Sequence, residues 1–264
     1  AQVDHLLKDR ASFEEHYRQR LHADAALRVN LDRWFELLND PRFGGDQNPR
    51  RFFVGSLYGR IRNAMGVENL SFLYYDDPGL LREMVDMVGE LTYQNTKYQL
   101  ELGRAANVRF DYAHFWEDIC FRNGPLVVPE VFAELTGPHY RRITALLKEH
   151  GVDFVSLDCD GNVASLAPFW LECGVNVMFP IELGVWDGNY GTLRQLCGKS
   201  LCGVGGVNKF VFAADYAAID REIERIRPYI ELGNYIPCPD HRIPPEAKWE
   251  NIQYYCDRIK NLSW

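Results

Sequence analysis

Two carboxylates and a thiol end an apolar run near the middle of the chain. In the segment FVSLDCDGNV (154–163), a mainly apolar stretch leads into Asp158, Cys159 and Asp160, and a Gly-Asn turn follows at once. On a β-strand, residues i and i+2 point to the same side, so we expect Asp158 and Asp160 to face one way and Cys159 the other. Paired carboxylates at a strand end suit proton transfer or the binding of a cation.

Polar residues follow several other apolar runs in the same way. Active sites of parallel α/β proteins gather at the C-terminal ends of the strands, so we expect these residues to share one rim. The rim would carry six carboxylates, and crowded like charges raise one another's pKa unless a cation lies among them. Taken singly, each residue could instead be a loop polar group or a helix cap. The rim residues are Ser56, Tyr58, Arg60, Glu117, Asp118, Asp158, Cys159, Asp160, Glu182, Asn208, Lys209, Asp240 and His241.

Strands and helices must alternate to position these residues. Such alternation predicts parallel βαβ units with helices covering the sheet. The first fifty residues have helical patterns that end in a Pro- and Gly-containing connector, so we divide the chain into a segment 1–50 and one α/β domain, 51–264. Six strands are predicted, over 51–59, 108–118, 152–162, 175–184, 200–208 and 233–245. Helices are predicted over 12–21, 30–40, 61–103, 128–151, 165–174, 190–198, 216–233 and 250–262.

Composition excludes some classes of function. The chain has 264 residues and a net charge of −8, which argues against a nucleic-acid-binding surface. No stretch reaches the ~18 apolar residues of a membrane-spanning helix, and the charged N-terminus is not a signal peptide. The seven cysteines are scattered, without a CxxC pair. We therefore predict a soluble, cytoplasmic protein with reduced thiols and a small-molecule substrate.

Five long motifs resemble the uroporphyrinogen decarboxylase superfamily, in particular its uroporphyrinogen decarboxylase-like branch. The resemblance runs from about Phe52 to the C-terminus and implies a (β/α)8 TIM barrel. Members of this superfamily usually have about a hundred more residues at the N-terminus, which supply the first two barrel strands. We therefore expect an incomplete barrel of about six strands, whose exposed edges are covered by upstream residues, a partner segment or a second copy in a homo-oligomer. The motifs are HFWEDICFRNGPLVVPEVF, PHYRRITALLKEHGVDFVSLDCDGNV, WLECGVNVMFPIELG, GVGGVNKFV and YIPCPDHRIPPEAKWENIQYY.

The resemblance implies two reactions. Corrinoid-dependent methyltransferases share this superfamily, so our first hypothesis is the transfer of a methyl group from a small methylated substrate to a corrinoid protein. The alternative is decarboxylation of uroporphyrinogen or a related acid. The true decarboxylase holds its substrate with arginines of the first strand region, which is not found here, and the rim has only Arg60, Arg62 and Arg122 as obvious cations. A third hypothesis is a catalytically inactive binding subunit.

The resemblance also implies a metal site. In the methylcobamide:coenzyme M methyltransferases, a His-x-Cys pair and a later Cys bind zinc, and these positions fall on Asp158, Asp160 and His241. Carboxylates and imidazole accept Zn, Fe, Mn or Co, and such a metal would act as a Lewis acid. The alternative is that Asp158 caps the turn, that Asp160 pairs with Arg122 or His241, and that no metal binds.

Roles for the other rim residues follow. We expect Glu117, His241 and Asp160 to be catalytic, with Glu117 as general acid. Gly203–Gly206 could let a ligand approach the backbone or could serve close packing, and Cys159 could be a buried small hydrophobe. Substrate binding is predicted for Tyr58, Arg60, Trp116, Asp118, Glu182 and Asn208.

Overall fold

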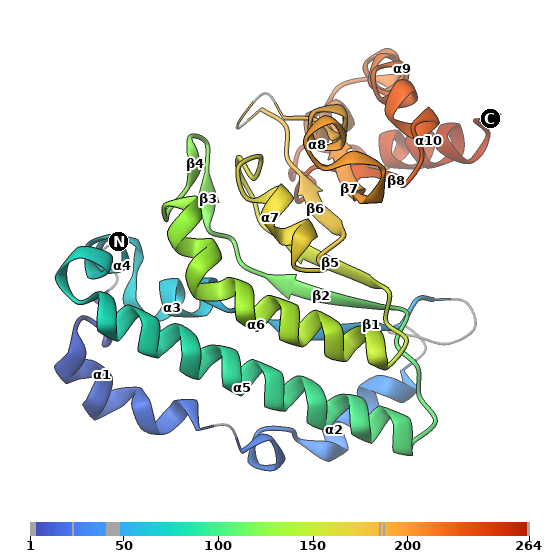
Figure 1. Cartoon of the computed structure of the whole chain (residues 1–264). Coiled ribbons are helices and arrows are strands. Elements are labelled where there is room, and N and C mark those ends of the chain that lie inside the picture. Colours follow the sequence, from blue (N-terminus) through green and yellow to red (C-terminus); the bar gives the residue numbers. More distant parts are fainter. Residues whose placement is uncertain (1–3, 23, 41–47, 185, 187, 263–264) are drawn as a thin grey trace. The chain divides into compact units, whose positions relative to one another are not determined.

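Strands and helices alternate along most of the chain in the computed structural model (Figure 1), which describes residues 4–22, 24–40, 48–184, 186 and 188–262. The chain packs into two compact units. The first comprises Ala1–Ile119, Pro125–Asp158 and Phe169–Asn176, and the second comprises Cys120–Gly124, Cys159–Pro168 and Val177–Trp264. Because these units are defined by packing, the predicted boundary at residue 50 stays a prediction.

The first unit contains a sheet of three parallel strands. Its order is β1 (Arg51–Gly55), β2 (Tyr112–Trp116) and β5 (Phe154–Asp158). Alternate residues of β2 are buried, whereas in β5 the three central residues, 155–157, are all buried. The register places His114 opposite Ser156 and Trp116 opposite Asp158, so these four side chains share one face of the sheet.

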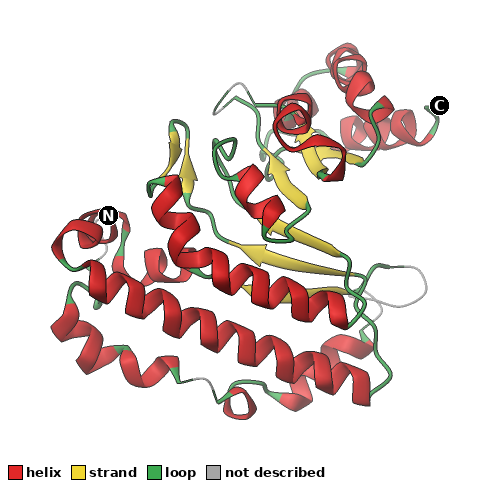
Figure 2. Ribbon diagram, in the orientation of Figure 1, coloured by secondary structure: helices red, strands yellow, loops and turns green. Residues whose placement is uncertain are grey.

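Two long helices of the first unit pack against each other beside its sheet (Figure 2). The first of them begins where Asp77 accepts a hydrogen bond from the backbone N–H of Leu80 and Pro78 occupies the first turn. Its buried face includes Leu81 and Val85. The α-helices of this part of the chain are α1 (Arg10–His16), α2 (Leu31–Asn39), α3 (Tyr58–Met65), α4 (Val67–Asp76), α5 (Pro78–Ala105) and α6 (Pro129–Glu149).

The second unit has three parallel strands of its own. Their order is β6 (Val177–Ile181), β7 (Cys202–Val207) and β8 (Tyr235–Pro239). A helix that packs on β7 and β8 buries Ile219, Ile223 and Ile226 in an apolar cluster. The α-helices of this unit are α8 (Tyr190–Cys197), α9 (Tyr216–Glu231) and α10 (Trp249–Lys260). The remaining elements among the described residues are α7 (Ala167–Glu172), the short strands β3 (Cys120–Phe121) and β4 (Gly124–Pro125), and the 3-10 helices η1 (Arg18–Leu21), η2 (Ala25–Leu27), η3 (Gly198–Ser200) and η4 (Lys209–Ala213).

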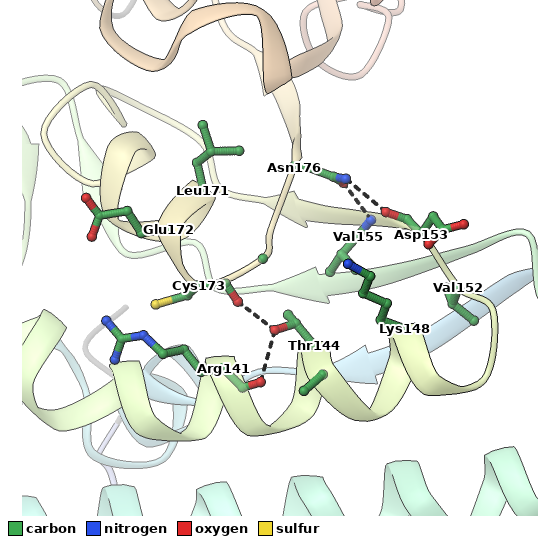
Figure 3. A pocket seen from close by; sticks show the side chains of 12 residues that line it. Arg141, Thr144, Lys148, Val152, Asp153, Val155, Leu171, Glu172, Cys173 and Asn176 are labelled. Carbon is green, nitrogen blue, oxygen red and sulfur yellow. Dashed lines mark hydrogen bonds between the residues drawn. The ribbon is translucent and has the colours of Figure 1, made fainter.

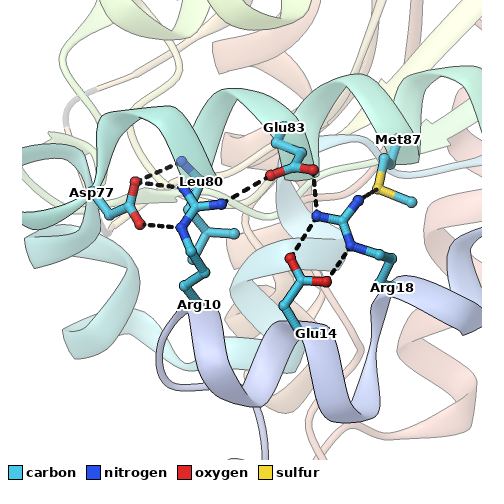
Figure 4. Close-up of polar contacts among 7 residues, drawn as sticks. All are labelled: Arg10, Glu14, Arg18, Asp77, Leu80, Glu83 and Met87. Atoms are coloured by element: carbon cyan, nitrogen blue, oxygen red, sulfur yellow. Dashed lines mark hydrogen bonds and ion pairs between the residues drawn. The ribbon is translucent and has the colours of Figure 1, made fainter.

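Within the first unit, ion pairs hold the N-terminal segment against α5 (Figure 4). The Arg10 guanidinium donates two hydrogen bonds to the carboxylate of Asp77, each of 2.8 Å, and a third of 3.1 Å to Glu83. Arg18 contacts the same Glu83 and also Glu14, one turn earlier in its own segment. Glu83 on α5 is therefore shared by two arginines of the N-terminal segment.

The α/β fold with six parallel strands is confirmed, three in each unit. The first predicted strand was too long: β1 ends at Gly55, whose φ of +106° leaves the extended region, and α3 begins at Tyr58. The predicted helix 12–21 was wrong in extent, because α1 ends at His16 and a 3-10 turn follows it. Among the described residues, no helix is both long and apolar enough to cross a membrane.

Candidate active site

Glu117, the first residue after β2, is at the centre of a buried hydrogen-bond network in the first unit. Its side chain is fully buried. One carboxylate oxygen accepts from the Leu57 backbone N–H at 2.7 Å and the Tyr140 hydroxyl at 2.6 Å. The other accepts from the Gly59 N–H at 2.6 Å and the Ser56 hydroxyl at 3.1 Å. The carboxylate thus ties the loop after β1 to the end of β2 and to α6.

The surroundings of Glu117 affect its pKa and leave little space beside it. Burial raises its pKa, while the four donors oppose that rise by stabilising the ionised form. A Cβ at position 59 would lie 2.0 Å from the Glu117 carbonyl oxygen, so only glycine fits there. Full burial and four donors suit a carboxylate that holds the loop, and the role of Glu117 as general acid stays a prediction.

Beside Glu117 lies a charged pair formed by Arg62, on α3, and Asp118, two residues after β2. Arg62 donates to Asp118 at 3.1 Å, and its guanidinium lies 5.6 Å from the ring centre of Trp116. Asp118 has a φ of +49°, an uncommon value for a residue other than glycine. Two of the predicted substrate-binding residues, Trp116 and Asp118, are therefore brought together by one arginine.

A second polar cluster of the first unit lies on the sheet face that carries Trp116. His114 Nδ1 lies 2.8 Å from the Ser156 hydroxyl, and His114 Nε2 lies 3.8 Å from Asp158 Oδ2. Burial lowers the pKa of His114 from 6.5 to about 4, and Arg51 acts in the same direction. His114 is therefore neutral near pH 7. It was missed from the sequence because it lies within a strand and not after one.

In the second unit, Asp160 and His241 lie beside each other, an arrangement that the alternative without a metal also predicts. Asp160 Oδ2 and His241 Nε2 are 3.4 Å apart, with both side chains about one-third exposed. Glu182 accepts a 2.9 Å hydrogen bond from the Gly161 N–H. Burial raises the pKa of Glu182, and the negative charge of Asp160 adds to this effect. These three predicted residues therefore influence one another electrostatically.

Asp240 and Asn208 have mainly structural contacts. Asp240 is buried and accepts hydrogen bonds from the backbone N–H groups of Leu183, at 2.9 Å, and Lys209, at 3.0 Å. The Asn208 side chain caps η4 by accepting from the Phe210 N–H, while its own N–H donates to the carboxylate of Glu222. For Asn208 the geometry matches a helix cap, which was the alternative interpretation.

The part of the sequence that contains these strand ends matches a known protein family. The sequence profile described as uroporphyrinogen decarboxylase (URO-D) matches residues 56–262. The chain belongs to the uroporphyrinogen decarboxylase family. A methyltransferase from Methanosarcina mazei is a similar solved structure, with a TM-score of 0.66 and 16% sequence identity over 91% of this chain and 68% of that one. At this identity the likeness shows the fold alone. No curated protein matches the chain.

The family resemblance implies a metal held by Asp158, Asp160 and His241. Two of these three predicted ligands, Asp160 and His241, lie in the second unit. Two ligands about 2.1 Å from one tetrahedral ion are about 3.4 Å apart, and Asp160 and His241 have this separation. Within the described part of the chain, however, no group of three or more His, Cys, Asp or Glu side chains is assembled for a metal ion. The pair fits two ligands and not a complete site, so metal binding at Asp158, Asp160 and His241 stays a prediction.

The remaining predicted residues of this uroporphyrinogen decarboxylase family member differ in how deeply they are buried and in what they contact. Tyr58 is buried and packs edge-on against Phe132, and Arg60 is exposed with its guanidinium near Gly55. Cys159 is buried, as a small hydrophobe would be. In Gly203–Gly206, a Cβ at positions 203, 205 or 206 would lie within 2.7 Å of neighbouring atoms, which supports the close-packing alternative.

A cavity of about 560 Å³ in the first unit lies away from these strand ends (Figure 3). It is lined by residues at the end of α6 and the start of β5, the opposite end of that strand from Asp158. Its polar groups hold local structure: the Asn176 amide bridges Val155 N–H and Asp153 C=O, and Thr144 donates to the Cys173 carbonyl. In barrels this end serves stability and not catalysis.

Backbone N–H groups contact three of the predicted rim carboxylates. Crowded carboxylates were predicted to raise one another's pKa unless a cation lies among them, and Asp160 does contribute to the raised pKa of Glu182. Glu117 has two of these N–H donors, Asp240 has two and Glu182 has one. Peptide N–H groups carry partial positive charge and stabilise an anion without a metal. Asp158 in the first unit, and Asp160 and His241 in the second unit, have partly exposed side chains.

Proposed function

We propose that the chain is a methyltransferase that moves a methyl group from a small methylated substrate to a corrinoid protein. The observation that carries the proposal is the partly exposed Asp160–His241 pair, two residues after β5 and two residues after β8 along the chain. A histidine beside a carboxylate is suited to proton transfer with a bound substrate. The fold shared with the methyltransferase from Methanosarcina mazei supports the same reaction class.

The Asp160–His241 pair would act on the substrate heteroatom from which the methyl group is removed. When the bond between the methyl carbon and a substrate oxygen or sulfur breaks, its electron pair stays on the heteroatom, which then takes up a proton. The protonated His241 ring, stabilised by Asp160 beside Nε2, would donate that proton. The corrinoid of the partner protein would supply the acceptor for the methyl group.

Asp160 and His241 are also the residues that would contribute to holding a divalent metal. Such an ion, Zn or one of Fe, Mn and Co, would supply Lewis-acid polarisation of the substrate heteroatom. Because the described residues offer two ligands and not three, we keep this as a separate proposal with its own test.

The methyl-transfer proposal is tested by following methylation of a corrinoid protein with a panel of small methyl ethers, thioethers and amines. We expect His241→Ala to lower kcat about a hundredfold, the usual contribution of a general acid, and Asp160→Asn to lower it about tenfold. The double variant Asp86→Asn, His139→Gln is the matched control, since it alters a His–Asp pair of 2.9 Å on α5 and α6. Rates that the two site variants leave unchanged would contradict the proposal.

The metal is tested by elemental analysis of protein purified without chelator, beside the double variant Asp160→Ala, His241→Ala. Near-stoichiometric metal that is lost in the variant is the expected result. If wild type and variant are equally empty after loading with Zn, Fe, Mn or Co, the metal proposal is rejected.

The alternative is decarboxylation, which the family's own description favours. Uroporphyrinogen carries eight carboxylates and suits a site rich in arginine, whereas Arg62 here is already paired with Asp118. Release of CO2 from uroporphyrinogen or a smaller acid, without methyl transfer, would establish this alternative. If neither reaction occurs with any substrate of the two panels, an inactive binding subunit becomes the better hypothesis.

A further inference from the structure

Exposed apolar side chains of the second unit surround the Asp160–His241 pair. Phe121 is 52% exposed, Phe210 is 63% exposed, and Ile243, two residues after His241, is 40% exposed. Single exposed apolar residues are common on protein surfaces, whereas a group of them around a candidate site marks a place where another molecule binds.

One of the three residues is held beside Asp160. The Asn162 N–H donates a 2.9 Å hydrogen bond to the Phe121 carbonyl. A Cβ at Gly161 would lie 2.8 Å from the carbonyl oxygen of Cys120. The short strand β3 is therefore in direct backbone contact with the turn that follows Asp160, and this contact places Phe121 next to the pair.

The other two residues lie beside His241. The Lys209 N–H donates a 3.0 Å hydrogen bond to Asp240 Oδ1, so the start of η4 is fixed against the residue that precedes His241. Phe210 is the next residue of η4, and Ile243 belongs to the segment that continues from His241. The apolar residues therefore lie on the side of Asp160 and on the side of His241.

Each of the three apolar residues has a basic neighbour in the sequence. None of these three cations forms an ion pair with a carboxylate of the described residues. The Lys209 ammonium lies 5.5 Å from the centre of the Phe210 ring, where the cation and the ring attract each other. The basic neighbours are Arg122, Lys209 and Arg242.

The carboxylates at the same strand ends add little exposed negative charge. Glu182 and Asp240 are buried, and Asp160 is about one-third exposed beside His241. Around the pair, one partly exposed carboxylate therefore faces three cations. This local excess of positive charge contrasts with the net charge of −8 of the whole chain.

We propose that these apolar and basic residues form a docking face for the corrinoid protein, whose surface around its corrinoid is apolar at the centre and acidic at the rim. The inference rests on the proposed methyl transfer. In that reaction the corrinoid must come within bonding distance of the methyl group beside the Asp160–His241 pair, so the partner has to contact the residues around the pair. Aromatic and arginine side chains are frequent anchors of protein interfaces, and cations steer an oppositely charged partner. The docking face consists of Phe121, Arg122, Lys209, Phe210, Arg242 and Ile243.

Docking is measured by biolayer interferometry of the whole chain against a panel of corrinoid proteins, each loaded with hydroxocobalamin. No methylated substrate is present, so binding is recorded separately from methyl transfer. Between about 20 and about 300 mM NaCl, we expect the association rate constant to fall about tenfold, because salt screens the charges that steer the partner.

Variants assign the binding to the docking face. Phe121→Ser and Phe210→Ser are each expected to raise Kd at least about tenfold, since a few aromatic anchors supply most of the binding energy of an interface. Arg242→Glu should lower the association rate constant several-fold and weaken its dependence on salt. Leu232→Ser and Lys199→Glu are the matched controls and should leave Kd unchanged, because both residues are exposed and precede β8 and β7, at the opposite ends of these strands.

The outcomes separate the docking face from the proposed function. His241→Ala is expected to slow methyl transfer and to keep docking. Docking that is lost in the face variants, without methyl transfer to any partner, would reject only the proposed function. Methyl transfer to a corrinoid protein at the wild-type rate by Phe210→Ser and Arg242→Glu would reject only the docking face.

The docking face is also overturned if no corrinoid protein binds, or if binding does not depend on salt. Sedimentation of the chain alone tests a different occupant. If the face variants convert a dimer into monomers, a second copy of the chain covers this surface and the proposal is wrong. Circular dichroism establishes that each variant is folded.

Discussion

Each of the two units has a buried carboxylate directly after a strand. The two carboxylates differ in the segments that they hold in place. Glu117 in the first unit follows β2 and has four donors, two of them backbone N–H groups and two of them hydroxyls. Asp240 in the second unit follows β8 and accepts from two backbone N–H groups, one in the loop after β6 and one after β7. The longer glutamate side chain reaches a helix, whereas the shorter aspartate holds neighbouring loops.

The comparison shows that an acidic residue at a strand end, although predicted from the sequence to be part of an active-site rim, can have a structural role. A buried carboxylate is unfavourable unless donors replace the water that it loses. At both positions some of those donors are backbone N–H groups that would otherwise lack partners, from loop residues Leu57 and Leu183 and from the first turns of α3 and η4. The same contacts that stabilise the charge therefore fix the loops that present the candidate site.

The largest effect is expected from breaking the Glu117 network. Glu117→Gln removes the charge and turns an N–H2 group toward donors that require an acceptor. We expect the free energy of unfolding to fall by about 3 kcal/mol, measured as a shift of the urea midpoint with an unchanged slope.

The matched control for this substitution is Glu134→Gln, at an exposed position where the carboxylate pairs with Arg82. Exposed pairs contribute roughly 0–1 kcal/mol, so the midpoint should change little. If Glu117→Gln has no larger effect than Glu134→Gln, the first unit does not depend on its buried carboxylate.

A smaller effect is expected at Asp240. Asp240→Asn keeps one acceptor oxygen and places an amide N–H2 against a backbone N–H, which we expect to cost about 2 kcal/mol of unfolding free energy. The measurement is again urea unfolding, with the exposed Asp257→Asn as control. A loss equal to or greater than that of Glu117→Gln would reverse the ranking of the two carboxylates.

The smallest effect is expected from removing a single donor of the Glu117 network. Tyr140→Phe removes the 2.6 Å hydrogen bond from α6 and should cost about 1 kcal/mol. In a double-mutant cycle with Glu117→Gln, the two losses should not add, because both remove the same contact. Strict additivity would mean that Tyr140 stabilises the chain through its packing and not through Glu117.

Much of the fold could be predicted from the sequence, because each strand is an apolar run that ends in polar residues. The strand 152–162 was predicted around β5 in this way. The limits of elements were less predictable, since they depend on backbone geometry. The φ of +106° at Gly55, which ends β1, is not visible in a pattern of apolar residues.

The candidate site was predictable by residue type and not by side-chain contact. Glu117 and Asp240 were recognised as rim residues, but their donors lie far away in sequence: Leu57 is 60 positions from Glu117, and Leu183 is 57 positions from Asp240. Only the folded chain shows that these side chains turn inward. His114 was missed because the search followed strand ends, although its i, i+2 relation to Trp116 places both on one face.

The arginines of the N-terminal segment are synthesised before the carboxylates on α5 with which they pair. Arg10 and its partner Asp77 are 67 positions apart in the chain. At roughly 5–20 residues per second of translation, Arg10 leaves the ribosome seconds before Asp77 exists. The segment of the first helix therefore spends that interval without its docking partner, and a segment of seven residues forms little stable helix on its own.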